Sequence, residues 1–156
     1  MRKQPEHMKL KDFIICDDIR MEINNKVSLI GVYNDALHFM VPERAISTWP
    51  KILRLGFFIR LVMEDPEEQR KIGKLVIESS IDGEINYHAE QIVDTKKLEP
   101  TPVGQMIISS VFNNINIPKK GDMELTLAIF NRKNELMDKF NYPGNLRITE
   151  ILQKIN

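Results

Sequence analysis

The sequence contains few of the residues that build disulfides and metal centres. It has one cysteine, Cys16, and three histidines among its 156 residues. A single cysteine excludes an internal disulfide and suits a reducing compartment, so we expect a cytoplasmic protein. We interpret Cys16 as a small buried apolar residue, because no histidine or second cysteine lies near it in the sequence to activate the thiol.

Patterns for cofactor binding and nucleophilic catalysis are also missing. The seven glycines are scattered, which argues against a phosphate-binding loop, and no G-x-S-x-G elbow occurs. His7, His38 and His88 are too far apart for an H-x-H or H-E-x-x-H pattern, which argues against a zinc site. We therefore expect no cofactor and no metal, and we expect that the protein is not an enzyme.

An excess of charge of one sign is absent as well. The 22 Lys and Arg residues balance the 22 Asp and Glu residues, so no long-range field would attract nucleic acid or an anionic membrane. No apolar run approaches the roughly 20 residues of a membrane span. Residues 1–11 lack the apolar segment of a secretory signal, and we interpret them as a flexible leader before a single domain at residues 12–156.

Alternation of apolar and polar residues is the dominant pattern that the sequence does contain. In residues 51–63 every odd position from Leu53 to Met63 is apolar, which predicts a strand with one fully buried face. Residues 121–130 and 84–93 repeat the pattern, the latter with Ile85, Tyr87, Ala89 and Val93 facing inward. The residues expected in the core include Leu53, Phe57, Ile59, Leu125, Leu127 and Ile129.

Turn signals separate these runs at intervals typical of strands. Asp82-Gly83 predicts a tight hairpin, and residues 94–104 form one long proline-containing connection that would carry the chain from one sheet to the other. The pattern predicts a single antiparallel β-sandwich of about seven to nine strands, with Greek-key, immunoglobulin-like or calcium-sandwich-like connections. Residues 146–156 fit either a short strand or a helix.

Two adjacent carboxylates interrupt the first predicted hairpin, in the run "IICDDIRMEINNKVSLIGVY" at residues 14–33. A two-residue turn at Asn24-Asn25 would place Met21 opposite Ser28 and Asp17 opposite Val32, with Asp18 opposite Gly31. Both faces of this hairpin are partly apolar, so a carboxylate there needs hydrogen bonds or a cation. We expect a bulge or bend at residues 16–18 in which an aspartate accepts backbone N–H groups; the alternative is a contact with a ligand or partner.

The same run resembles a family of small, uncharacterised bacterial proteins with a domain of unknown function. The residues that carry the resemblance are Cys16, Asp17, Asp18, Arg20, Glu22, Lys26, Ser28, Leu29, Ile30, Gly31 and Tyr33, followed by the "FFIRL" run at residues 57–61. The resemblance covers roughly the first 60 residues and is moderately specific. It implies a compact β domain in bacteria or their mobile elements, and it implies no activity.

Five residues are candidates for a binding site: Asp17, Asp18, Arg20, Trp49 and His88. His88 falls on the polar face of its strand, where a solvated histidine is the alternative, and Trp49 is either a core anchor or a partner contact. The leading hypothesis is a non-catalytic module that binds another protein. Alternatives are a small-ligand or calcium-binding domain, in which Asp17, Asp18, Asp82 and Asp122 would converge, and a hydrolase with an unrecognised site. The oligomeric state is open.

Overall fold

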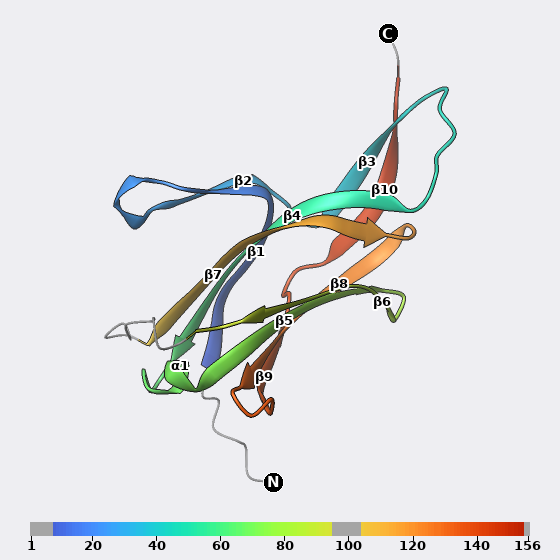
Figure 1. The fold of residues 1–156 in the computed structure, drawn as a ribbon. Coiled ribbons are helices and arrows are strands. Elements are labelled where there is room, and N and C mark those ends of the chain that lie inside the picture. Colours follow the sequence, from blue (N-terminus) through green and yellow to red (C-terminus); the bar gives the residue numbers. More distant parts are fainter. Residues whose placement is uncertain (1–7, 95–103, 155–156) are drawn as a thin grey trace.

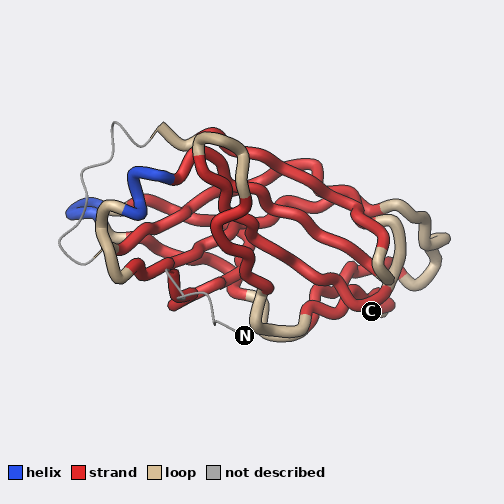
Figure 2. The backbone as a smooth tube through the Cα atoms, turned by 90° about the horizontal axis from the view of Figure 1, so that it is seen from below, coloured by secondary structure: helices blue, strands red, loops and turns tan. Residues whose placement is uncertain are grey.

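The computed structural model describes residues 8–94 and 104–154, which form two β-sheets packed face to face (Figure 1). The first sheet has the strand order β2-β1-β4-β7, and the second has the order β3-β10-β8-β5-β6, with β9 paired to β8. Strands account for nearly all of the regular structure, as the tube in Figure 2 shows. The predicted all-β sandwich is therefore confirmed.

The strands of the first sheet are β1 (Met8–Met21), β2 (Val27–Val32), β4 (Lys51–Met63) and β7 (Gln105–Ile117). Those of the second sheet are β3 (Ala36–Pro42), β5 (Ile72–Ile81), β6 (Glu84–Ile92), β8 (Gly121–Asn131), β9 (Leu136–Asn141) and β10 (Leu146–Gln153). The described residues contain two short helices, η1 (Ile23–Asn25) and α1 (Glu68–Lys71). No helix among them has the length and hydropathy needed to cross a bilayer.

Two features of the sheets differ from the expected architecture. The described residues form ten strands, more than the predicted seven to nine, because the apolar runs at residues 27–42 and 136–153 divide into short separate strands. The pairing of β3 with β10 is parallel, whereas every other ladder is antiparallel. The step from β6 to β7 leads from the second sheet to the first, as predicted, although residues 95–103 within it lie outside the described residues.

The core lies between the inner faces of β4, β5 and β8. On β4 the alternate residues from Leu55 to Met63 are at most 1% exposed, and each such side chain contributes about 1.5 to 3 kcal/mol by burial. Of the six residues predicted in the core, Phe57, Ile59, Leu125, Leu127 and Ile129 are buried and Leu53 is partly buried against the others. The period-two pattern therefore identified the inner face correctly.

β1 pairs with two strands in succession. Its residues from Met8 to Cys16 pair with β4, and those from Cys16 to Met21 pair with β2. Beyond Cys16 the β1–β2 hairpin leaves the sandwich and projects from it as a two-stranded arm (Figure 1). We call residues 17–32 the β1–β2 arm.

Three local expectations change in the structure. The leader does not reach residue 11, because β1 begins at Met8 and Met8 is buried. Residues 146–153 form the strand β10 rather than a helix, and Ile155 lies outside the described residues. Ile85 is 65% exposed instead of facing inward, because a bulge opposite Ser79 and Ser80 shifts the alternation of β6 at that point.

The Asp82-Gly83 turn forms as predicted between β5 and β6. Both residues have positive φ, 51° at Asp82 and 80° at Gly83, and Ile81 pairs with Glu84 across the turn. Positive φ at both central positions is the conformation of the type I′ turn, which matches the twist of the two strands.

Alanine substitution of core residues tests this assignment of the inner face. Leu127→Ala or Ile59→Ala should lower the free energy of unfolding by about 2 to 5 kcal/mol, because each leaves a cavity among fully buried neighbours. Ile92→Ala, at a side chain that is 76% exposed, should change it by less than about 0.5 kcal/mol. Urea unfolding midpoints measure the difference, and equal effects at buried and exposed positions would contradict the assignment.

Candidate functional site

The pairing register within the β1–β2 arm differs by one residue from the predicted register. Met21 lies opposite Val27 and Cys16 lies opposite Val32. Asn24 and Asn25 do have positive φ, 65° and 57°, but they belong to a longer loop closed by a hydrogen bond from Glu22 N to Lys26 O. Because side chains alternate along a strand, the shift gives every residue of β2 a different partner on β1. It also changes which residues of the two strands share a face.

Asp17 lies against Gly31 at the base of the arm. Gly31 has a φ of 66°, and a Cβ added there would lie 2.2 Å from the Oδ2 atom of Asp17. The register is the same on both sides of Asp17, so no extra residue is inserted and, of the predicted bulge or bend, the chain forms the bend, where the arm leaves the sandwich. The partner of the carboxylate is a side chain, because the Tyr33 hydroxyl donates a hydrogen bond to Asp17 Oδ1.

Asp18 forms an ion pair with the neighbouring strand β4. Arg54 Nη2 donates a hydrogen bond to Asp18 Oδ1 at 2.8 Å, and Arg20 Nε lies 3.8 Å from Asp18 Oδ2. These side chains are partly exposed, so the interaction contributes at most about 1 kcal/mol. The ion pair links the base of the arm to β4.

A close approach between β1 and β4 at Gly56 makes the departure of the arm possible. A Cβ at Gly56 would lie 2.9 Å from Cys16 Sγ and 3.0 Å from Ile19 Cγ1. Cys16 is fully buried, and its Sγ lies 3.7 Å from Gly56 O and 3.4 Å from Asp18 O. The burial of Cys16 confirms its interpretation as a small buried residue, and this burial raises the pKa of its thiol.

Tyr33 connects the arm to the sandwich. It packs partly against the core, and its backbone N–H donates to Ile15 O at 2.9 Å. Burial raises the pKa of the Tyr33 hydroxyl, and the hydrogen bond to Asp17 raises it further. The neutral hydroxyl is therefore the form that the folded protein favours.

Trp49 lies in the segment that enters β4 and packs against the core. Its ring makes an edge-to-face contact with Phe39, with the centroids 5.8 Å apart, and Lys51 Nζ lies 5.4 Å from the Trp49 ring centroid. Of the two alternatives for Trp49, the structure shows the packing contact. This contact joins β3 to the start of β4 and does not include the aspartates of the arm.

His88 lies on the outer face of the second sheet, between two carboxylates. Its Nδ1 is 3.4 Å from Glu78 Oε2 and its Nε2 is 3.1 Å from Glu90 Oε1. Hydrogen bonds to Glu90 and Glu78 raise the pKa of His88, and His88 in turn lowers the pKa of Glu90. The imidazole is exposed and has a carboxylate at each nitrogen, which is the geometry of a surface ion pair.

The structure thus brings Asp17, Asp18 and Arg20 together and leaves Trp49 and His88 in other parts of the fold. The four aspartates considered for calcium do not converge, since Asp82 pairs with Lys119 at 2.9 Å and Asp122 lies 4.0 Å from Arg147. Within residues 8–94 and 104–154 there is no group of three or more His, Cys, Asp or Glu side chains that could hold a metal ion.

Sequence reasoning missed two members of the cluster at the base of the arm, Tyr33 and Arg54. Tyr33 belongs to the residues that carry the family resemblance, whereas no sequence pattern marks Arg54. The contact with Tyr33 depends on the hairpin register, which the sequence pattern placed incorrectly, and the contact with Arg54 depends on the pairing of β1 with β4.

No protein-family model matches the chain, and no curated protein matches it at a significant level. The resemblance of residues 16–33 to a bacterial family therefore remains a prediction.

Alanine at Gly31 tests the contact with Asp17. Gly31→Ala should destabilise the protein more than Gly83→Ala, because both glycines have positive φ but only Gly31 has a side chain in the space of the new Cβ. Loss of the glycine conformation alone costs about 1 kcal/mol, which Gly83→Ala should show. Urea midpoints measure both, and the excess at Gly31 should shrink when Asp17 is also alanine. Equal effects at the two glycines would refute the contact.

The Tyr33 hydroxyl should contribute stability that disappears in alkali. Tyr33→Phe should lower the free energy of unfolding by about 1 kcal/mol at neutral pH, because the carboxylate of Asp17 loses a donor. The folded pKa is raised, so the contribution is fully present below the unfolded pKa of about 10 and is lost as pH rises through the folded pKa. The gap between wild type and variant should therefore narrow above about pH 10. Urea midpoints on both sides of that pH check this, and a constant gap would be the contrary result.

Proposed function

We propose that this protein is a non-catalytic interaction module that binds another protein through its β1–β2 arm. The observation that carries the proposal is the exposure of large apolar side chains on an element that projects from the sandwich (Figure 1). Four such residues lie on the arm: Met21 at 69%, Ile23 at 85%, Ile30 at 38% and Val32 at 49% exposure.

The arm exposes apolar side chains on both of its faces. Residues directly opposite each other share a face, so Ile30 and Val32 lie on the face of Asp18 and Cys16, whereas Met21 lies on the other face. Ile23 is at the tip, within the short helix η1. A partner that surrounds the arm would cover all four residues, whereas a flat surface would cover only one face.

The polar contacts at the base of the arm support the same role. An isolated two-stranded hairpin is marginally stable in water, so a binding arm needs to be held by the body of the protein. The Tyr33–Asp17 hydrogen bond and the Arg54–Asp18 ion pair provide these attachments. Asp17, Asp18 and Arg20 then act by positioning the arm, and the apolar residues beyond them make the contact.

The lone buried Cys16 and the balanced charge fit a module that works in the cytoplasm of a bacterium or in a mobile-element context. Balanced charge provides no long-range steering, so specificity would come from the shape and the apolar contacts of the arm.

Substitutions at the far end of the arm test this function. Met21→Ser/Ile23→Ser should abolish retention of a partner from a lysate of the source cells, because the two side chains are the most exposed apolar groups of the arm. The matched control is Ile85→Ser/Ile92→Ser on β6, where the side chains are 65% and 76% exposed, and it should retain the partner. The purified partner should bind the arm variant at least about tenfold more weakly by calorimetry. Identical sets of retained proteins for all three forms would refute the proposal.

A further inference from the structure

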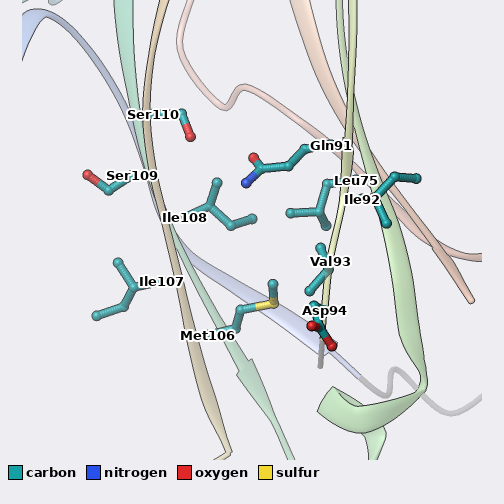
Figure 3. Close-up of a pocket in the computed structure, with 10 residues that line it drawn as sticks. All are labelled: Leu75, Gln91, Ile92, Val93, Asp94, Met106, Ile107, Ile108, Ser109 and Ser110. Atoms are coloured by element: carbon teal, nitrogen blue, oxygen red, sulfur yellow. The ribbon is translucent and has the colours of Figure 1, made fainter. Parts of the chain in front are cut away.

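We propose that the cavity between β6 and β7 is a binding site for a small uncharged molecule with an apolar body and one hydrogen-bonding group. β7 is the edge strand of the first sheet and β6 is the edge strand of the second, so the two strands form one side of the sandwich. The cavity has a volume of about 260 Å³ and is lined by Leu75 and by residues 91–94 and 106–110 (Figure 3). None of these residues belongs to the β1–β2 arm, so the site is separate from the partner contact proposed above.

Aromatic packing closes the space between the two strands at one end. Tyr87 on β6 and Phe112 on β7 make an edge-to-face contact with their ring centroids 6.0 Å apart, and Phe112 makes a second one with Phe57 at 5.5 Å. Beside them Asn86 Nδ2 donates a hydrogen bond to the Asn116 backbone carbonyl at 2.8 Å, which joins β6 directly to β7. The cavity lies beyond these contacts, toward the last residues of β6 and the first residues of β7.

Small and polar residues at inward positions account for the cavity. On β7, Ser110 pairs with Phe57, which is fully buried, so Ser110 also faces inward. On β6, Gln91 pairs with Leu75, which is 4% exposed, so Gln91 shares the inner face, and alternation places Ala89 there too. Protein interiors are normally packed without spaces of this size. A serine, a glutamine and an alanine leave one here because they stand at positions that large apolar side chains occupy in the middle of the sandwich.

The walls of the cavity are apolar. Met106 and Ile108 extend from β7 into the cavity, and Leu75 lies across from them on the second sheet (Figure 3). All three side chains are at most 7% exposed. Ile107 and Ser109, the alternate residues of β7, lie on the opposite side of the strand (Figure 3). An apolar ligand body would therefore contact side chains that belong to the core of the sandwich.

Hydrogen-bonding groups lie at one end of these walls. The Gln91 amide extends from β6 toward β7, and Ser110 lies at the same end of the cavity (Figure 3). Both side chains donate and accept hydrogen bonds. No lysine or arginine lines the cavity among the described residues, and its one carboxylate, Asp94, takes part in another interaction. Because a buried charge without a partner is costly, the ligand is an uncharged molecule.

The size of the cavity limits the ligand to a compact molecule. An apolar cavity of about 150 Å³ holds one benzene molecule. The larger space between β6 and β7 therefore accommodates a ring or a short aliphatic chain with one polar substituent. Sites for small molecules are typically apolar clefts in which a few polar groups fix the orientation of the ligand, and Gln91 and Ser110 supply such groups here.

Titration with p-cresol and n-pentanol, one aromatic and one aliphatic member of this class, tests the site. The methyl NMR signals of Met106 and Ile108 should shift and saturate with at least one of the two, whereas the methyl signal of Met21 on the arm should not change. p-Cresol should bind about two- to tenfold more tightly than toluene, because toluene has the same ring and methyl group but no hydroxyl. Gln91→Leu/Ser110→Ala should remove that difference.

Two adjacent serines provide matched variants. Ser110→Leu fills the cavity and should weaken the binding of p-cresol at least about tenfold. Ser109→Leu adds the same side chain at the next position, on the opposite side of β7, and should bind p-cresol like the wild type. Urea unfolding shows whether both variants fold.

Three results would overturn the proposal. They are wild-type signals of Met106 and Ile108 that do not shift and saturate with either probe, equal binding of p-cresol and toluene to the wild type, and a Ser110→Leu variant that binds p-cresol as the wild type does. The first two are measured on the wild type, so they decide the matter if the variants fail to fold. Retention of a protein partner by the arm is a separate measurement, and neither result determines the other.

Discussion

Burial of the inner face of β4 against β5 and β8 is the interaction on which the rest of the structure depends. Leu55, Phe57 and Ile59 are fully buried there, and both neighbours of β4 in the first sheet are aligned by their pairing with it. Because the hydrophobic contribution scales with the apolar area removed from water, the position of the core follows this face. β1 is longer than the part of the core that it covers, and its remaining residues form the β1–β2 arm.

The direction of the arm is decided by weaker interactions than those of the core. The crossing at Gly56 depends on a missing Cβ, and the polar attachments at Tyr33 and Arg54 are partly exposed. Each contributes little to the free energy of unfolding, and all three lie at the base of the arm that carries Met21 and Ile23. A module that binds through an arm needs this positioning more than it needs added stability.

Both sheets carry outward charges in compensating pairs, such as Lys74 with Glu90 in the second sheet and Arg60 with Asp12 in the first. In the first sheet both edge strands, β2 and β7, are free of charged residues. The contact proposed for this protein involves the first sheet, through the exposed apolar side chains of the β1–β2 arm.

The sequence by itself determined the fold class and the inner faces, because alternation with period two depends only on neighbours along one strand. It also determined the Asp82-Gly83 turn, where the local conformational preference and the observed φ values agree. Around Asp17 and Asp18 the sequence was less informative. It identified the acidic pair, but the hairpin pairing that it predicted is shifted by one residue from the observed pairing. Only the tertiary structure joined the pair to Tyr33 and Arg54, and only it placed the uncharged strand β7 at the edge of a sheet, because strand order and pairing depend on contacts between segments far apart in the chain.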